Sequence, residues 1–163
     1  MENLNITAKI VVCKYDELNP AEKMLIDAAK DASLKAYSPY SKFNVGAAAL
    51  LSNKEVITGS NQENAAFPSG LCAERTVLFY ANSMYPDQAV ELIAVAAYTN
   101  GDFIEEPISP CGSCRQVILE VEKRYNHPVR ILLYGKKEIY IIEKVRDILP
   151  LSFDGSSLNI EIF

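Results

Sequence analysis

Three of the four cysteines in the chain have the spacing of metal ligands. Cys111 and Cys114 form a C-x-x-C pair, in which two intervening residues let both sulfurs reach one ion from the first turn of a helix. Cys72 lies far away in sequence, at the start of another segment rich in helix-forming residues. The positive end of the helix dipole and unpaired backbone N–H groups favour a thiolate at such a helix start.

The number of possible ligands decides which kind of metal site is expected. Three sulfurs suit zinc. A structural zinc site normally has four protein ligands, whereas a catalytic site has three and leaves one position for water. His127 precedes a proline in a polar turn and Cys13 precedes the first expected helix, so neither is well placed as a fourth ligand. The count favours a catalytic type of site. A redox dithiol and a pair of core cysteines stay open for the C-x-x-C pair, but both leave Cys72 unexplained.

The acidic residue Glu74 lies two positions after Cys72 in the sequence. Glu74 would lie on the same helical turn, near water at the open position but not bound to the ion. A carboxylate placed there can take a proton from water and pass it to a substrate nitrogen. A solvated glutamate that complements the helix dipole is the alternative. Beside three clustered thiols, the catalytic role is favoured.

Hydrophobic patterning predicts the elements that position these residues. Asn19-Pro20-Ala21-Glu22 has the composition of a helix start, and Tyr37-Ser38-Pro39-Tyr40 ends that helix. Two further helices are expected over residues 72–84 and 111–125. Strands are expected at residues 43–51, 56–60, 92–99, 129–134 and 139–142. The order α-β-β-α-β-α-β-β predicts an α/β fold with a mixed five-stranded sheet and helices packed on its faces.

Composition is typical of a globular protein. The 163 residues are 49% hydrophobic and 23% charged, which fits one domain over residues 1–163, with 1–15 as a poorly defined extension. Sixteen basic against 21 acidic residues give a net charge of −5, which disfavours a nucleic acid polymer and favours a small ligand. Residues 1–9 lack a signal-peptide pattern, and no apolar run reaches the ~20 residues of a membrane span. We therefore expect a cytoplasmic protein with reduced thiols and no membrane partner.

The cysteine segments resemble a known signature. Cys72-Ala-Glu74, followed by Pro110-Cys111-Gly-Ser-Cys114, is similar to the C-x-E and P-C-x-x-C motifs of zinc deaminases. Three other segments resemble the small cytidine deaminases of nucleoside salvage, and the similarity runs from about residue 37 to residue 158. These segments are Phe43-Asn-Val-Gly-Ala, Asn61-Gln-Glu63-Asn-Ala and Leu149-Pro-Leu-Ser-Phe153.

This resemblance implies a cytidine deaminase-like fold and a hydrolase of pyrimidine salvage. It implies one Zn²⁺ per subunit on Cys72, Cys111 and Cys114. Cytidine and deoxycytidine would be hydrolysed to uridine and deoxyuridine, and Glu74 would move the protons to N3 and to the departing ammonia. The similarity in length to the short form of the family implies a homotetramer.

The resemblance also assigns residues around the zinc site. Arg75 would hydrogen-bond the thiolates and reduce the net charge of −1 that three of them leave on Zn²⁺; a surface position on the helix is the alternative. Asn61 and Glu63 would bind the ribose 3′-hydroxyl, which both donates and accepts hydrogen bonds. Phe43 would lie beside the pyrimidine ring, and the backbone at Ala73 would meet the edge of the base.

Two aromatic positions concern the neighbouring subunits. Phe153 would reach into an adjacent site, and an apolar anchor within its own subunit is the alternative. Phe67 stands where tyrosine is frequent in the family that the chain resembles, and its role at the subunit boundary stays open.

Three other functions stay open at this point. A related aminopyrimidine nucleoside deaminase, of the blasticidin S type, would use the same zinc chemistry, but Asn61 and Glu63 favour a ribosyl substrate. A polynucleotide deaminase is disfavoured by the charge and by the lack of an aromatic and basic channel motif. A non-catalytic zinc-stabilised binding module would have no need of Glu74.

Overall fold

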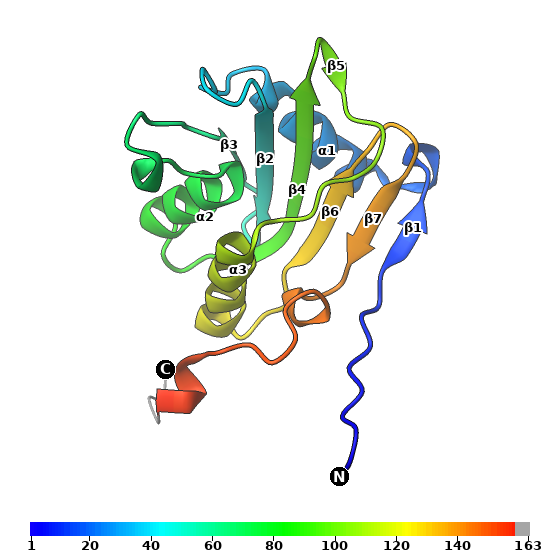
Figure 1. Ribbon diagram of the computed structural model, residues 1–163, viewed down its shortest axis with the longest axis vertical. Helices are drawn as coiled ribbons and strands as arrows, with labels where there is room; N and C mark the ends of the chain where they lie inside the picture. The colour runs from blue at the N-terminus through cyan, green and yellow to red at the C-terminus, as the bar shows by residue number, and fades with distance from the viewer. Residues whose placement is uncertain (159–163) are drawn as a thin grey trace.

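A mixed β-sheet forms the centre of the structure, which a computed structural model describes for residues 1–158 (Figure 1). The strand order is β1-β7-β6-β4-β2-β3, and β5 pairs with β4 beside this path. The strands are β1 (Val11–Cys13), β2 (Asn44–Leu51), β3 (Val56–Ser60), β4 (Val90–Thr99), β5 (Asp102–Phe103), β6 (Arg130–Tyr134) and β7 (Ile139–Ile142). β4 and β6 are parallel, and the other pairs are antiparallel. All five strands expected from the sequence are present.

Helices cover the two faces of this sheet. They are α1 (Pro20–Ser33), α2 (Ala73–Met84) and α3 (Gly112–Tyr125). Ala47 and Ala49 of β2 pack with α2 and α3, whereas Ala48 and Leu50 pack with α1. Side chains alternate between faces along a strand, so α1 lies on one face and the other two helices on the opposite face. The predicted α/β fold with helices on both faces is confirmed. Within residues 1–158, no helix has the length and apolarity required to cross a membrane.

The first helix begins as predicted but ends early. Asn19 accepts the backbone N–H of Glu22 at 3.0 Å, and the Glu22 carboxylate accepts that of Asn19 at 3.0 Å, which is a capping box. The helix ends at Ser33, before the expected stop at residues 37–40. The reason is a long-range contact, because the backbone of Tyr37 pairs on both its N–H and C=O with residues 61–63.

Two short strands were not expected. β1 lies in the segment predicted to be poorly defined, and it pairs antiparallel with β7, so that Val11 faces Ile141 and Cys13 faces Ile139. β5 has two residues and pairs antiparallel with the last two residues of β4, Tyr98 and Thr99. Strands this short contain too few residues for an alternating pattern, so their existence depends on the partner strand.

Gly46 of β2 provides a test of how closely α1 packs on the sheet. A Cβ at Gly46 would lie 2.0 Å from the carbonyl oxygen of Ala29 and 2.3 Å from the amide nitrogen of Ser33. Both are backbone atoms, which cannot rotate away. We predict that Gly46→Ala lowers the free energy of unfolding by roughly 3 kcal/mol or more, the upper end for overpacked interiors.

Urea unfolding at one fixed chain concentration measures this change. Gly112→Ala is the control, because apart from its chain neighbours and the backbone of its own helix no atom lies within 4 Å of its Cβ position, and its effect should stay within about 1 kcal/mol. Wild-type stability of Gly46→Ala would contradict the close packing.

Candidate zinc centre and substrate pocket

The starts of α2 and α3 bring three thiols together. Cys72 directly precedes α2, Cys111 directly precedes α3, and Cys114 lies in the first turn of α3. The Sγ atom of Cys111 is 3.9 Å from that of Cys72 and 3.4 Å from that of Cys114, and all three lie within 4.8 Å of one another. Two sulfurs that bind a tetrahedral zinc ion at ~2.3 Å are ~3.8 Å apart. The donor type and the spacing both fit zinc.

The other two residues weighed as ligands lie elsewhere. In the part of the chain that the structure describes, the ligand cluster consists of Cys72, Cys111 and Cys114 alone. Cys13 lies on the edge strand β1, and His127 follows the far end of α3. The donor set is therefore three thiols, the number typical of a catalytic rather than a structural zinc site.

The electrostatics of the cluster favour negative charge on sulfur. Hydrogen bonds from the Cys114 thiol and from Arg75 lower the pKa of Cys72 to about 5. The hydrogen bond to Cys72, together with burial, raises the pKa of Cys114. Arg75 Nη2 lies 3.8 Å from Cys72 Sγ. Its Nε atom is buried and has no acceptor among the described residues. Without a metal ion, the Cys114 thiol donates its proton in a hydrogen bond that stabilises the Cys72 thiolate. A bound cation would let all three thiols lose their protons.

Glu74 is buried beside this cluster. Only 5% of the residue is exposed, and it lines the same cavity as Cys72 and Cys111. Burial raises the pKa of the Glu74 carboxyl, and the charge of Cys72 raises it further. A carboxyl group with a raised pKa can accept a proton and also return it, as a group that serves both as base and as acid must do.

The cavity over the thiols has a volume of about 660 Å³. Three chain segments line it, and they surround the starts of α2 and α3. The lining residues are Tyr40, Ser41, Val45, Asn61, Gln62, Glu63, Asn64, Phe67, Gly70, Leu71, Cys72, Glu74, Arg75, Ile108, Ser109 and Cys111. A volume in this range is typical of small-molecule sites.

Asn61 and Glu63 both line the cavity, and both also hold its wall. The Asn61 amide accepts the N–H of Val45 at 2.7 Å and donates to the Phe43 carbonyl at 3.0 Å. One carboxylate oxygen of Glu63 accepts the N–H groups of Tyr40 and Ser41 at 2.8 and 3.2 Å. The second carboxylate oxygen and one amide N–H have hydrogen-bonding capacity left, so the pair can still hold a hydroxyl group.

Of the four other residues singled out in the sequence, Phe67 alone is among the described lining residues of this cavity. Among the described residues, its lining does not include Phe43, Ala73 or Phe153. Phe43 is partly buried, Ala73 is fully buried between two lining residues, and the Phe153 residue is 60% exposed. Phe67 lines the cavity and contacts Tyr40 edge-on, with ring centroids 5.8 Å apart. The substrate roles of Phe43, Ala73 and Phe153 stay predictions.

Comparison with known proteins identifies the family. A family model described as the cytidine and deoxycytidylate deaminase zinc-binding region matches residues 20–126, about two thirds of the chain. The chain belongs to this family. A cytidine deaminase of Halalkalibacterium halodurans is 43% identical over 139 residues, which are 84% of this chain and 97% of the relative. One of Sporosarcina psychrophila is 47% identical over 135 residues, 83% of this chain and 93% of the relative.

Solved structures agree with this assignment to the deaminase family. The cytidine deaminase of Burkholderia pseudomallei has a TM-score of 0.68 and 39% identity, and the match covers 80% of this chain and 97% of that one. The enzyme of Mycobacterium tuberculosis has a TM-score of 0.63 and 34% identity, with 80% and 95% covered. The resemblance drawn from the motifs, the deaminase fold and zinc as the cofactor are confirmed. The family match includes the three thiols and ends before Phe153.

Sequence reasoning missed Arg115, which holds the loop before α3 in place through hydrogen bonds. Its guanidinium donates to the Pro110 carbonyl at 2.8 Å, the Ile148 carbonyl at 2.7 Å and the Ser109 hydroxyl at 2.9 Å. Arg115 therefore ties the loop before α3 to the segment after β7. A signal for this role exists in the sequence, because a cation in the first turn of a helix is disfavoured by the helix dipole and needs another reason to be there.

The zinc content tests the three-thiol centre. We predict one zinc ion per chain in the purified protein, and loss of most of that zinc in Cys72→Ser and in Cys111→Ser, because each variant loses a sulfur ligand. Mass spectrometry of the metal in dialysed protein measures both. Cys13→Ser, which changes a thiol outside the cluster, should retain full zinc. Full zinc in either of the cluster variants would contradict the assignment.

Proposed function

We propose that the chain is a zinc-dependent cytidine deaminase, which converts cytidine and deoxycytidine to uridine and deoxyuridine with release of ammonia, in pyrimidine salvage. The observation that carries this proposal is the buried Glu74 carboxyl beside three clustered thiols, in a cavity that also contains Asn61 and Glu63. The relatives named cytidine deaminase, at 43% and 47% identity over most of the chain, support it.

Glu74 would move the protons of this reaction. Cys72, Cys111 and Cys114 would hold the zinc ion, which as a Lewis acid makes water a stronger acid near neutral pH. The Glu74 carboxylate would accept a proton from the attacking water and deliver it to N3 of the base. It would then take the remaining proton of that water from the new hydroxyl group on C4 and pass it to the amine, so that the C4–N bond breaks, ammonia departs and a carbonyl group forms. Its burial keeps bulk water from exchanging these protons.

The nucleoside would lie between the thiols and the wall of the cavity. Asn61 and Glu63 would hold the ribose 3′-hydroxyl with the amide N–H and the carboxylate oxygen that they do not use within the protein. Phe43 would lie beside the pyrimidine ring after a local adjustment, and the backbone at Ala73 would meet the edge of the base. Hydrogen bonds from Ser41 lower the pKa of Glu63, which keeps its carboxylate available as an acceptor.

We also propose that four copies of the chain associate and that Phe153 completes the cavity of a neighbour. Several large apolar residues are exposed in one copy, as an unformed interface requires. They include Phe67 at 74%, Leu151 at 83%, Phe153 at 60%, Tyr80 at 54% and Phe79 at 49%. The positions of Phe67 at the cavity and Phe153 in the tail support contacts of this kind between copies.

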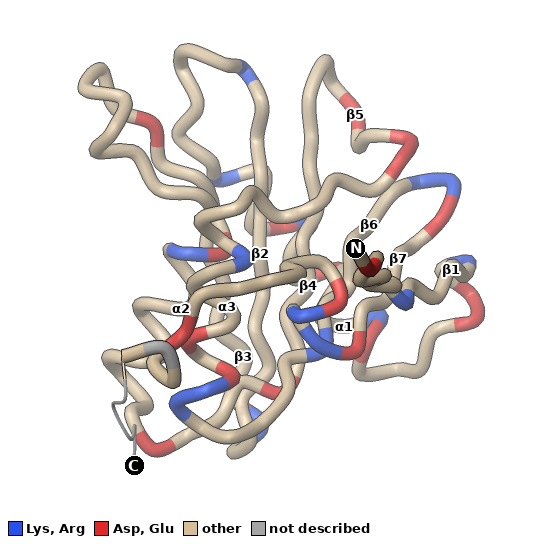
Figure 2. The backbone as a smooth tube through the Cα atoms, turned by 60° about the horizontal axis from the view of Figure 1, so that its bottom comes forward, with Lys and Arg blue, Asp and Glu red and all other residues tan. Residues whose placement is uncertain are grey.

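The proposed partner is a small nucleoside rather than a nucleic acid polymer or a membrane. Basic and acidic positions are interspersed along the backbone (Figure 2), and several lysines are paired with acids. Lys136, for example, contacts Asp102 at 2.5 Å and Glu105 at 2.8 Å. Such pairing leaves less positive charge for phosphates. We propose that the chain acts in the cytoplasm. We also propose that it forms one domain, because α1, α2 and α3 pack on one sheet.

Substitution of Glu74 tests the reaction. Glu74→Gln removes the proton acceptor and keeps the shape of the side chain, so we expect full zinc and a loss of kcat of about 10²–10⁴-fold, the usual range for a general acid–base. Ammonia release and the fall in cytidine absorbance measure it. Glu55→Gln, at an exposed turn position, is the control and should be fully active.

The same assay compares cytidine, deoxycytidine and blasticidin S. Preferential turnover of blasticidin S would replace the proposed substrate. A zinc-loaded wild-type protein without any turnover would instead favour a zinc-stabilised binding module.

Arg75 is proposed to offset the charge of the thiolates. Three thiolates and Zn²⁺ sum to −1, and the guanidinium 3.8 Å from Cys72 Sγ reduces this charge. We predict that Arg75→Ala retains zinc and lowers kcat by roughly 10–100-fold, as for other residues that support metal ligands. Arg124→Ala, at an exposed position on α3, is the control. Wild-type kcat in Arg75→Ala would remove this role.

A further inference from the structure

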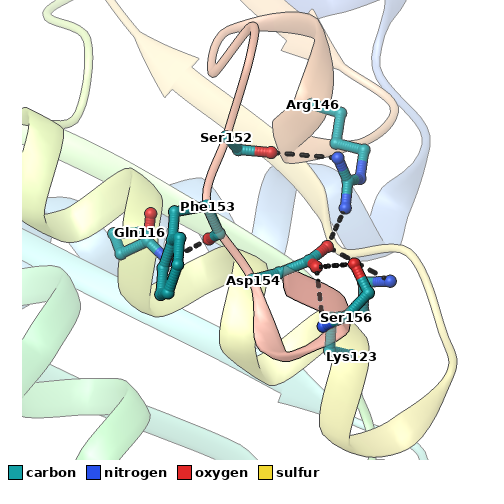
Figure 3. Close-up of polar contacts among 7 residues, drawn as sticks. All are labelled: Gln116, Lys123, Arg146, Ser152, Phe153, Asp154 and Ser156. Carbon is teal, nitrogen blue, oxygen red and sulfur yellow. Dashed lines mark hydrogen bonds and ion pairs between the residues drawn. The ribbon is translucent and has the colours of Figure 1, made fainter. Parts of the chain in front are cut away.

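Asp154 is a buried carboxylate in the C-terminal tail that the proposed reaction does not use. Its exposure is 5%, and it pairs with Lys123 of α3 at 3.3 Å and with Arg146 of the short helix η3 (Val145–Asp147) (Figure 3). It also accepts the Ser156 N–H at 3.0 Å and the Ser156 hydroxyl. One side chain therefore joins the tail, the second half of α3 and the segment after β7.

Neighbouring groups stabilise the ionised form of the Asp154 carboxylate. Hydrogen bonds from Ser156 and the positive charge of Lys123 hold the pKa of Asp154 well below its usual range. The same carboxylate caps the helix η4 (Gly155–Leu158), because it accepts a backbone N–H of its first turn. Asp154 therefore fixes the backbone that directly follows Phe153.

A second set of contacts fixes the backbone before Asp154. Gln116 Nε2 donates to the carbonyl of Phe153 at 2.8 Å, and Arg146 donates to the Ser152 hydroxyl at 2.9 Å. In Figure 3 the Phe153 ring and the Asp154 carboxylate extend to opposite sides of the tail. Polar contacts thus hold the backbone on both sides of Phe153, while 60% of that residue stays exposed.

This arrangement is unfavourable for a chain on its own. Burial of an aromatic ring is favourable, and a free tail would fold the ring against the nearest apolar surface. Leu151, 83% exposed, also has a left-handed backbone (φ 51°), which bulky residues avoid. The contacts therefore maintain a strained segment that keeps two apolar side chains in solvent. A surface of another molecule explains why such a segment is held in place.

The cavity of a second copy has the matching chemistry. The cavity of the same chain does not include Phe153 among its described lining residues. Its rim does carry exposed apolar side chains, Phe67 at 74%, Tyr40 at 51% and Leu71 at 37%. An aromatic ring presented from outside would cover this rim and exclude water from the substrate.

We propose that Asp154 is a positioning residue, whose ion pairs with Lys123 and Arg146 preset the Phe153 ring for the cavity of a second copy. The inference rests on the role proposed above for Phe153. A ring already held in place loses little freedom when substrate binds. The clamp formed by Asp154, Lys123 and Arg146 therefore acts on substrate binding rather than on the chemical step.

Asp154→Asn is the first test. Asparagine can still accept the Ser156 N–H but carries no charge for Lys123 and Arg146. We expect KM for cytidine to rise by roughly 3–10-fold, the effect of ordering one or two side chains on binding, with kcat, zinc content and oligomeric state unchanged. Hydrogen exchange of residues 150–158 should become faster. Asp31→Asn, an exposed position on α1 on the other face of the sheet, is the matched control.

A double variant separates positioning from an independent effect. Phe153→Ala alone should raise KM, and Phe153→Ala combined with Asp154→Asn should raise it no further, because the clamp then has no ring to position. If the two single-variant increases in KM multiply in the double variant, the role of Asp154 is overturned and that of Phe153 is not. The same holds if Asp154→Asn has wild-type KM while Phe153→Ala has a raised KM. Wild-type KM in Phe153→Ala would overturn the role of Phe153 and this inference with it.

A weaker change covers the case in which Asp154→Asn does not fold. Lys123→Gln removes one ion pair and leaves the cap on Ser156 intact. It should raise KM in the same direction by a smaller factor, at full zinc and wild-type kcat. Wild-type KM in Lys123→Gln, with unchanged hydrogen exchange of the tail, would then overturn the proposal.

Discussion

The convergence of two helix starts on three sulfur atoms is the constraint on which the site depends. Both Cys72 and Cys111 directly precede a helix, and neither side chain caps that helix. The free N–H groups and the positive ends of both dipoles therefore lie near the sulfurs. These groups stabilise negative charge on the clustered sulfurs, which would otherwise repel one another, before any cation binds. Glu74 follows from the same geometry, because it is two residues further along a helix whose start is fixed.

The sheet determines where those two helix starts meet. α2 and α3 lie on one face of it, and β4 and β6 are parallel, so α3 must cross from one end of the sheet to the other between them. Small residues set how closely the helices approach. A Cβ at Gly59 of β3 would lie 3.0 Å from Cγ2 of Val77 on α2, and Ala47 and Ala49 are fully buried below the same helices. Larger side chains there would move the start of α2 away from that of α3.

Local chemistry made much of this predictable from the sequence. The cap at Asn19, the C-x-x-C spacing of Cys111 and Cys114 and the position of Glu74 relative to Cys72 are each encoded within a few neighbouring residues. What was missed depends on partners far away in sequence. β1 exists through β7, the end of α1 through the pairing of Tyr37 with residues 61–63, and the role of Arg115 through Ile148. The clamp on Asp154 joins residues 123, 146 and 154 and has no local pattern at all.

The cavity wall shows why binding and folding are inseparable at this site. The Asn61 side chain, which lines the cavity, holds Val45 of β2 and Phe43 just before this strand, and Glu63 holds the backbone of Tyr40 and Ser41 with one of its two carboxylate oxygens. In this loop Lys42 has a left-handed backbone (φ 58°), a strained conformation that needs support from its surroundings. A substitution of Asn61 or Glu63 therefore removes the proposed substrate contact and releases the loop at the same time. A rise in KM from such a variant measures both losses together. Only the second carboxylate oxygen of Glu63 and the second amide N–H of Asn61 could bind a substrate without a role in holding the loop, so only a change confined to these two groups would separate the two losses.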